Sequence, residues 1–427
     1  MGEAKNITAG YDFGDGVPIK VRYIFRGTPY GKEELAAVKE AFKGGTLTMG
    51  PQVEAFEKEF ARYVGCKHAF AVSNCTTAMH VVTQMLDLGP GAEVITTPNT
   101  FIATSLVIVK EGATPVYADI DPRTHNIDPA SIEKKITRRT KAIYIVHYGG
   151  QSCDMDAIMR ISRKYKIPVM EDCAHALGTR FHGKHAGTFG VAGCFSFHSL
   201  KNITTCGEGG MITINDDRWV EPIKMLRCMN IHHWRDKDAA RLMKEYGVHK
   251  KDREYWLPSH FDVEDVNGRW GMNYRMNEVS AAVGRVQLSK VNKFVARRRE
   301  CAHYLNKHLQ GIPGITPVFE DPRGFHSYHL YTLCVEEKAL GASRDAFMRA
   351  LYYKEGIQGI QHYQPTYDFT GFRKLGHKGR QCPEAERFFY HRETNLPMHP
   401  MLTNRELQDM VHGIRRAAEQ VRGTGLR

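Results

Sequence analysis

Short apolar runs alternate with segments of helical periodicity, and this alternation most constrains the fold. Apolar residues recur at helical spacing in GKEELAAVKEAF (31–42) and GPQVEAFEKEFARYVG (50–65), whereas HAFAVS, EVITTP, KAIYIVHY and IPVMED are short apolar runs bounded by turn residues. Strands separated by helices typically build a mostly parallel sheet with helices on both faces. The sequence therefore predicts an α/β fold whose ligand site lies at the carboxyl ends of the strands.

The length and the later part of the chain predict two domains. A chain of 427 residues is too long for one compact core. After a polar, aromatic and charged stretch at 230–271, the pattern predicts two helices, at about Met276–Leu288 and Val291–Leu309, and then a smaller α/β part. We expect an N-terminal arm (1–30), a large domain (31–290) and a small C-terminal domain (291–427).

The charge of the chain favours anionic partners. Its 59 Lys and Arg against 47 Asp and Glu give a formal charge of +12, which suits a phosphorylated cofactor, a nucleotide diphosphate or nucleic acid. A solvated basic surface without a function explains the charge equally well. The longest basic cluster, Arg297–Arg299, has no interleaved aromatic residues, so we do not expect nucleic acid as a partner.

Cysteine usage and hydropathy exclude other classes. The ten cysteines include no CxxC pair and no zinc spacing with histidine, so we expect reduced thiols and no metal. The first residues contain no apolar signal core, and no apolar run reaches the length of about 18 residues that spans a bilayer. We therefore expect a cytoplasmic protein with no membrane partner.

One forty-residue segment, Glu171–Gly210, carries the strongest chemical signal. Asp172 ends the apolar run IPVMED, Lys201 follows the strand-like CFSF, and a Gly-rich hairpin comes next. These residues suit a pyridoxal phosphate pocket: Asp172 can keep the pyridine nitrogen protonated, and the amine of Lys201 can form a Schiff base with the aldehyde. Taken alone, Lys201 could be a solvated lysine, and Asp172 could be a helix cap or half of an ion pair.

The same segment resembles the sugar aminotransferases of the DegT/DnrJ/EryC1/StrS family, and the likeness runs from about Val21 to Leu402. It implies an aspartate-aminotransferase-type fold (fold type I) and a homodimer with shared active sites. It also implies amino transfer from glutamate or glutamine to a keto sugar, which we expect to be nucleotide-linked. The segments VHYGGQSCDMDAI and FSFHSLKNITTCGEGG are most similar to members that aminate C4 of a UDP-linked 4-keto hexose.

The remaining cofactor contacts combine local chemistry with this resemblance. The segment Ser73–Ala78 opens a helix, and the N–H groups there, including those of Cys75 and Thr76, could bind a phosphate or simply cap the helix. Relatives commonly carry Gly in place of Cys75. By resemblance, Phe101 stacks on the pyridine ring and His175 contacts the phenolic oxygen, although both could be core residues. Ser196 can donate to the phosphate or bond to the backbone.

Other residues are candidates for the substrate or for the neighbouring subunit. Asn273 resembles an asparagine that reaches across the dimer to the cofactor phosphate, and Arg275 could meet a substrate phosphate; both could instead organise the interface. Further substrate candidates are His198, His329, Tyr331 and His362.

Two other functions remain open from the sequence. A sugar dehydratase of the same fold would use pyridoxamine phosphate, but such relatives replace the lysine by histidine, and Lys201 is present. A regulatory protein that keeps the fold without turnover would not need the set formed by Asp172, His175, Ser196 and Lys201.

Overall fold

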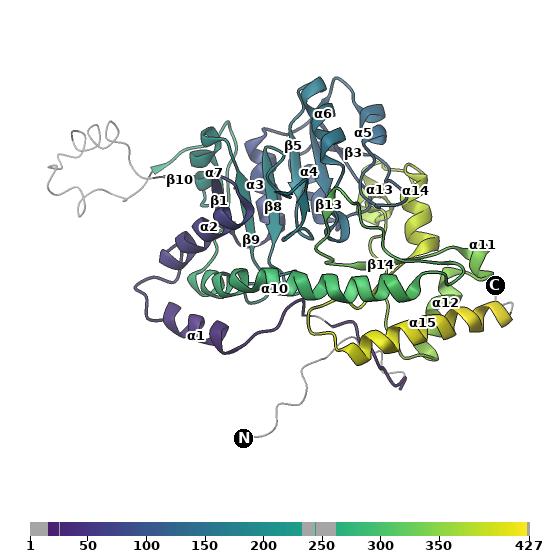
Figure 1. The fold of residues 1–427 in the computed structure, drawn as a ribbon. Coiled ribbons are helices and arrows are strands. Elements are labelled where there is room, and N and C mark those ends of the chain that lie inside the picture. Colours follow the sequence, from purple (N-terminus) through teal and green to yellow (C-terminus); the bar gives the residue numbers. More distant parts are fainter. Residues whose placement is uncertain (1–15, 25, 233–243, 245–261, 425–427) are drawn as a thin grey trace.

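The structure is a computed structural model, and it describes residues 16–24, 26–232, 244 and 262–424. Its largest feature is a seven-stranded sheet (Figure 1). The first 15 residues of the expected N-terminal arm, and most of the polar stretch at 230–271, lie outside the described residues. The strands of this sheet are β1 (His68–Val72), β2 (Glu93–Thr96), β3 (Thr114–Tyr117), β4 (Thr140–Val146), β5 (Val169–Asp172), β8 (Ala192–Ser196) and β9 (Gly210–Ile214).

The topology of the large sheet confirms the predicted α/β class. Its order is β1-β9-β8-β5-β4-β2-β3. The pairs β5–β8, β4–β5, β2–β4 and β2–β3 are parallel, and only β9 runs antiparallel to its neighbours β1 and β8. Four of the apolar runs in the sequence, at 68–73, 93–98, 141–148 and 167–172, fall on β1, β2, β4 and β5.

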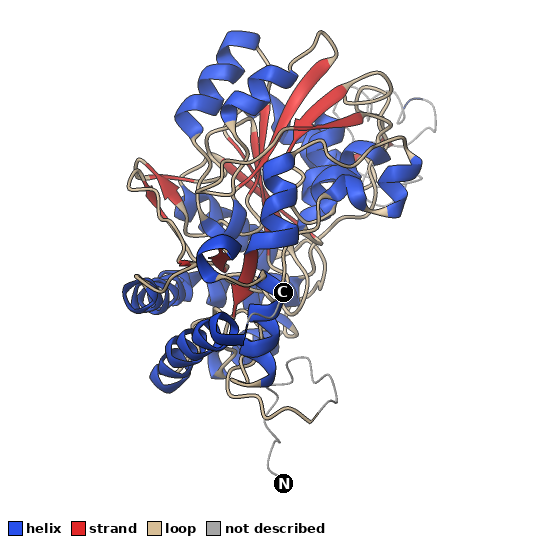
Figure 2. Cartoon of the chain, turned by 90° about the vertical axis from the view of Figure 1, so that its right-hand side faces the viewer, coloured by secondary structure: helices blue, strands red, loops and turns tan. Residues whose placement is uncertain are grey.

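Helices cover both faces of this sheet, as Figure 2 shows. Because strand residues alternate in direction, Tyr144 packs on one face with α3 and α4, whereas Ile143 and Ile145 pack on the other with α5 and α6. Phe195 faces α2 and the first half of α10. The helices around the sheet are α1 (Lys32–Ala41), α2 (Pro51–Val64), α3 (Cys75–Met85), α4 (Ala103–Lys110), α5 (Pro129–Lys135), α6 (Met155–Tyr165), α7 (Val220–Leu226) and α10 (Glu278–Leu309).

The two helices predicted at 276–288 and 291–309 are one continuous helix, α10, of 32 residues. The residues at the expected break, Ser289 and Lys290, are neither Gly nor Pro, and the Ser289 hydroxyl donates to the carbonyl of Val286 within the helix. The buried side of α10 instead changes partners, from Leu288 in the core of the large sheet to Leu305 in the C-terminal core. That change of partners produced the apparent break.

A second core surrounds a small antiparallel sheet of order β12-β14-β15. Leu305, Leu333 and Phe347 belong to this core, and α15 runs beside α10 (Figure 1). The expected boundary at 290/291 falls inside α10, and the division into domains stays a prediction. The elements here are β12 (Ile315–Thr316), β14 (Tyr331–Val335), α11 (Glu337–Leu340), α12 (Arg344–Tyr353), α13 (Thr370–Lys374), α14 (Pro383–Arg387), β15 (Glu393–Leu396) and α15 (Asn404–Thr424).

Two smaller sheets complete the description. One has the order β13-β6-β7 and the other pairs β10 with β11. Among the described residues, no helix has the length and apolar character needed to cross a bilayer. The strands of these sheets are β6 (Arg180–Phe181), β7 (Lys184–His185), β10 (Ile231–His232), β11 (Asp262–Val263) and β13 (Gly324–Phe325).

The register of the parallel strands brings the predicted chemical residues to one edge. Val146 at the end of β4 pairs with Asp172 at the end of β5, and Asp172 pairs with Cys194 in β8. The start of α3 also reaches this edge. A Cβ on Gly210 would lie 2.4 Å from the backbone of Asn74, so glycine allows α3 to approach β9.

Candidate active site

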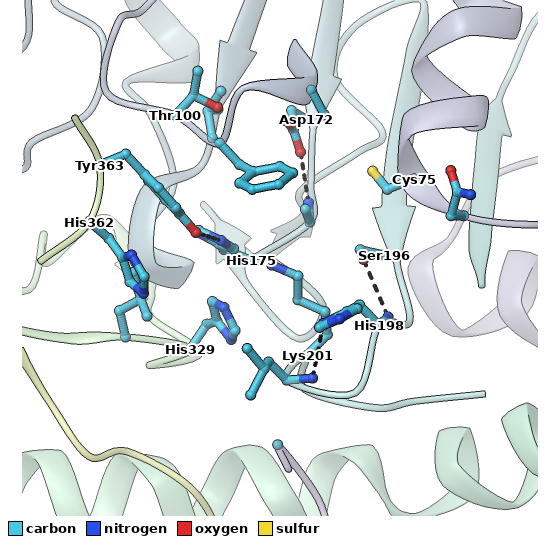
Figure 3. Close-up of a pocket in the computed structure, with 18 of the residues that line it drawn as sticks. Cys75, Thr100, Asp172, His175, Ser196, His198, Lys201, His329, His362 and Tyr363 are labelled. Atoms are coloured by element: carbon cyan, nitrogen blue, oxygen red, sulfur yellow. Dashed lines mark hydrogen bonds between the residues drawn. The ribbon is translucent and has the colours of Figure 1, made fainter. Parts of the chain in front are cut away.

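A cavity of about 410 Å³ lies at the carboxyl edge of the large sheet (Figure 3). Its wall combines residues of the large sheet with residues from the N-terminal arm and the C-terminal part. Most of the predicted site residues line it, namely Cys75, Thr76, Phe101, Asp172, His175, Ser196, His198, Lys201, His329 and His362.

Lys201 lies in the turn after β8, where its backbone N–H donates to the carbonyl of His198 (2.8 Å). Gly27 packs directly on this turn, because a Cβ at position 27 would be 2.2 Å from the carbonyl oxygen of Lys201. Burial lowers the pKa of Lys201 to about 8, although the nearby charge of Asp172 acts in the opposite direction. About a tenth of this amine is therefore unprotonated, and nucleophilic, at pH 7, compared with far less for a lysine of ordinary pKa.

Asp172 is held by hydrogen bonds to both of its carboxylate oxygens. Thr104 at the start of α4 donates its hydroxyl to Oδ2 (2.8 Å), and the N–H of Ala174 donates to Oδ1 (3.0 Å). The hydroxyl of Thr100 lies 2.7 Å from that of Thr104 and can complete a short chain. Burial raises the pKa of Asp172, while these hydrogen bonds and Lys201 favour its charged form.

His175 lies within a group of aromatic side chains. Its Nδ1 accepts from the N–H of Gly149 (3.3 Å), which leaves the proton on Nε2, 3.2 Å from the hydroxyl of Tyr363. Its ring lies 4.3 Å, centroid to centroid, from that of His329. Burial lowers the pKa of His175 well below its ordinary value, so this ring is neutral and can donate one hydrogen bond from Nε2.

The first turn of α3 faces the cavity with free donors. Asn74 caps the helix by accepting from the N–H of Thr77 (2.9 Å). The N–H groups of Cys75 and Thr76 belong to the first turn, where no carbonyl lies one turn earlier to accept from them. The Cys75 thiol donates to the carbonyl of Cys194 (3.5 Å).

Phe101 and Ser196 complete the part of the wall that the sequence predicted. Phe101 is 57% exposed although it lines the cavity, so its ring has a free surface to offer. Ser196 is buried at the end of β8, and its hydroxyl accepts from the N–H of His198 (3.3 Å). That hydroxyl can still donate its own proton to a ligand.

Among the substrate candidates, the structure separates Tyr331 from the histidines. Tyr331 is fully buried in the C-terminal core, and its hydroxyl donates to Oδ1 of Asn306 (2.7 Å). His329 and Tyr331 are two residues apart, a spacing that would place them on one face of a strand. His329 lies before β14, however, so this alternation does not apply to it. We therefore remove Tyr331 from the proposed site, whereas His198, His329 and His362 line the cavity.

Asn273 and Arg275 lie outside the cavity wall of their own chain. Arg275 pairs with Val72 at the end of β1, and its Nε donates to Oδ1 of Asn273 (3.1 Å). Asn273 is exposed and Arg275 is half-buried. This position, close to the start of α3, leaves both side chains available to a neighbouring subunit.

Several residues at the cavity were missed by sequence reasoning. Thr104 does not line the cavity but bonds to Asp172 behind its wall, and its position one helical turn after Phe101 was a usable signal. Tyr23, Arg26 and His399 come from the N-terminal arm and from the end of the small sheet. Tyr363 was passed over beside His362. No local pattern marks such residues, because their approach depends on how distant segments pack.

A buried group behind the cavity consists of His147, Glu171 and Cys173, whose ligand-capable atoms lie within 4.8 Å of one another. Glu171 already accepts from the N–H groups of Gly187, Phe189 and Gly190 (each 2.7 Å), and from Nε2 of His147 (3.0 Å). Four hydrogen bonds use all the lone pairs of this carboxylate. The group therefore anchors the loop between β7 and β8, and Glu171 has no lone pair left for a metal ion.

The chain is similar in sequence and in fold to known proteins. SpsC, a spore coat polysaccharide biosynthesis protein of Bacillus subtilis, is 38% identical over 386 residues, which cover 90% of this chain and 94% of that protein. PseC of Helicobacter pylori, an aminotransferase involved in the biosynthesis of pseudoaminic acid, has a TM-score of 0.81 and 28% identity, with coverage of 93% and 99%. A Streptococcus pneumoniae protein solved in a PLP form has a TM-score of 0.81 and 25% identity, with coverage of 93% and 98%.

The fold and these relatives define a pyridoxal phosphate (PLP)-dependent sugar aminotransferase of the aspartate-aminotransferase type (fold type I), as the sequence predicted. The sequence model of one aminotransferase family matches residues 29–415, which is nearly the whole chain. The chain belongs to the DegT/DnrJ/EryC1/StrS aminotransferase family.

Proposed function

We propose that the chain transfers an amino group from glutamate or glutamine to a nucleotide-linked keto sugar, such as a 4-keto hexose, with PLP held at Lys201. The observation that carries this proposal is a buried lysine with a pKa of about 8 in the same cavity as the hydrogen-bonded carboxylate of Asp172. A buried amine that is easily deprotonated, together with a carboxylate whose charged form is favoured by two hydrogen bonds and by Lys201, suits imine exchange and proton transfer.

The residues present fit this cofactor. The N–H groups of Cys75 and Thr76 and the hydroxyl of Ser196 would hold its phosphate at the positive end of α3. Asp172 would face the pyridine nitrogen, and the ring of Phe101 offers a stacking surface. When bound, PLP supplies an electron sink for the bond broken at the donor carbon.

The chain's own groups then move protons and orient the cofactor. The amine of Lys201 would bind the cofactor covalently and, once displaced by the donor, would carry a proton between the donor's Cα and the cofactor's C4′. Nε2 of His175 would donate a hydrogen bond to the phenolic oxygen of the cofactor. Tyr363 packs beside His175 and restricts its movement.

We also propose that the working unit is a cytoplasmic homodimer in which each site is completed by the neighbour. The supporting observation is that Asn273 and Arg275 are polar and accessible beside the start of α3, yet neither reaches the cavity of its own chain. A phosphate at the N–H groups of Cys75 and Thr76 would lie close to this surface.

A two-part experiment tests the proposed function. Purified protein with PLP should show a visible absorption band that bleaches with glutamate or glutamine, and borohydride should fix the cofactor to Lys201. Product mass from a panel of nucleotide-linked keto sugars should then identify the acceptor. If the band does not bleach with either donor, the proposed donors are wrong. If sugars without a nucleotide react equally well, the nucleotide link is wrong.

A further inference from the structure

One buried cation organises three distant chain segments at the cavity. Nη2 of Arg298 donates to the carbonyl of Gly27 (2.8 Å), and Nη1 donates to the carbonyls of His329 (3.3 Å) and Met398 (2.7 Å). Arg298 itself is 1% exposed, and burial lowers its pKa to about 10. Because these carbonyls meet at one guanidinium group, the segments at 26–27, 329 and 398–399 lie close together.

Each of these segments brings a basic side chain to the wall of the cavity: Arg26, His329 and His399. We call these three side chains the Arg298 wall. In the part of the chain that the structure describes, Arg26 has no acidic partner, and its Nε is buried without a hydrogen bond. The acidic side chains that line the cavity are Asp172 and Glu208. Asp172 accepts from Thr104 and Ala174, and Glu208 lies 4.0 Å from Nε2 of His198; among the described residues, neither carboxylate forms an ion pair with the Arg298 wall.

The two histidines of this wall also lack partners. His329 is 7% exposed and His399 is 6% exposed, and Nδ1 of each is sealed from solvent with no hydrogen bond to any described residue. A buried nitrogen without a partner costs less free energy as a bare acceptor than as an N–H group. The proton of each neutral ring is therefore expected on Nε2 rather than on the buried Nδ1. Because Nδ1 is sealed, each ring that lines the cavity presents its other edge, where this N–H is available to an acceptor.

We propose that Arg26, His329 and His399 form a binding subsite for the carboxylate of the amino donor, an inference that rests on the proposed function. A carboxylate accepts bidentate hydrogen bonds from an arginine and single bonds from two imidazole N–H groups. It would also neutralise the charge of Arg26 and lie in the field of Arg298. This donor set has no acidic member, so an anion is the ligand class that satisfies it.

The place of the subsite distinguishes a donor carboxylate from a substrate phosphate. The backbone beside Arg26 contacts Lys201, because Gly27 packs on the carbonyls of Leu200 and Lys201 and its N–H donates to Ser199 (2.7 Å). Figure 3 shows His329 beside Lys201. The α-carboxylate of an amino acid is bonded to the carbon that loses its proton to Lys201. The phosphates of a nucleotide-linked sugar lie a sugar ring away from the ketone.

Calorimetry with two probes on the PLP-loaded chain tests the subsite. Glutarate carries two carboxylates but neither an amine nor a ketone, so it binds without reacting; UDP reports on a phosphate subsite. We compare Arg26→Met and His399→Phe with Arg22→Met. Arg22 lies in the same arm and is not part of the cavity wall. Melting temperatures of all three variants show whether each is folded.

Arg26→Met should weaken glutarate binding by about tenfold or more, and His399→Phe by about threefold to tenfold, because each loses a hydrogen bond to a charged group. UDP binding should change by less than about twofold, and Arg22→Met should leave both probes unaffected. Weaker UDP binding with unchanged glutarate binding would reassign the wall to substrate phosphate. Unchanged binding of both probes, or equal weakening by Arg22→Met, would overturn the proposal.

The proposed function can fail separately from this subsite. If borohydride does not label Lys201, the PLP chemistry is wrong whatever the glutarate result. If Lys201 is labelled and glutarate binds equally well to Arg26→Met and to the unaltered chain, only the subsite is wrong. Glutamate and 4-aminobutanoate, which lacks the α-carboxylate, give a further check: Arg26→Met should reduce the preference for glutamate in the bleaching reaction.

Discussion

The two sides of the cavity differ in how completely their polar groups are satisfied. On the side built by the large sheet, both oxygens of Asp172 accept hydrogen bonds, and Thr104 is itself close to Thr100. On the Arg298 wall, Nδ1 of His329, Nδ1 of His399 and Nε of Arg26 are buried and have no partner among the described residues. A preorganised side suits chemistry on a fixed cofactor, whereas a side whose cavity-facing donors have no acceptor in the chain suits a ligand that comes and goes.

This difference predicts different kinetic effects for substitutions on the two sides. Groups on the sheet side would act most strongly as charge moves during the reaction, so their loss should lower kcat. Groups on the Arg298 wall would bind the donor in ground and transition states alike, so their loss should raise the KM for the donor.

The largest effect is expected for Lys201→Ala, which should abolish turnover because both imine exchange and proton transfer need this amine. Borohydride should no longer fix PLP to the chain, and circular dichroism should show an intact fold. Lys184→Ala is the matched control, since Lys184 is exposed on β7. Normal turnover by Lys201→Ala, or labelling of another lysine in the unaltered chain, would contradict the assignment.

Asp172→Asn should lower kcat by about 10²–10³-fold, because an amide cannot stabilise the positive charge on the pyridine nitrogen. The KM for the sugar should change much less, since the interaction strengthens as electrons enter the ring. Steady-state kinetics with both substrates measure the two parameters. A variant with the kcat of the unaltered chain would show that another group holds the nitrogen.

Thr104→Val should lower kcat by about tenfold, the effect of one hydrogen bond to a charged group. Its loss removes an influence that lowers the pKa of Asp172. The carboxylate will then be protonated at a higher pH, and the acid limb of the kcat profile should move upward. Thr104→Ser keeps the hydroxyl and should leave that limb in place. An upward shift with serine as well would mean that the methyl group, rather than the hydrogen bond, matters.

The sequence predicted the sheet side far better than the Arg298 wall. Asp172, Ser196 and Lys201 lie in one segment, and parallel strands necessarily bring their carboxyl ends to one edge. Arg26 and His399 are 373 positions apart in the numbering (399 minus 26), and Arg298 links their segments by donating to the carbonyls of Gly27 and Met398. The predicted break in α10 was wrong for a related reason. The buried side of this helix changes from one core to the other, and the sequence alone does not show which core each residue contacts.

The smallest effect is expected in a subunit-mixing experiment, which tests whether a neighbouring chain completes the sheet side of the cavity. If Asn273 or Arg275 serves the partner's site, an inactive Lys201→Ala chain mixed with an inactive variant at Asn273 or Arg275 should regain activity. Random pairing makes half of the dimers mixed, and each mixed dimer contains one site with both parts intact, so about a quarter of the sites should recover. The exposed position of Asn273 and its bond to Arg275 motivate the test.

Two controls keep this mixing experiment decisive. Mass measurement must show that mixed dimers have formed, and Lys201→Ala mixed with itself must stay inactive. A verified mixed dimer without activity would mean that each chain completes its own cavity, and Asn273 and Arg275 would then belong to the interface alone. A monomeric mass with full activity would remove the shared site altogether. In that case the free donors at the start of α3 would have to hold the cofactor phosphate with Ser196 alone, and the phosphate would be held more weakly than the aldehyde end that is bonded to Lys201.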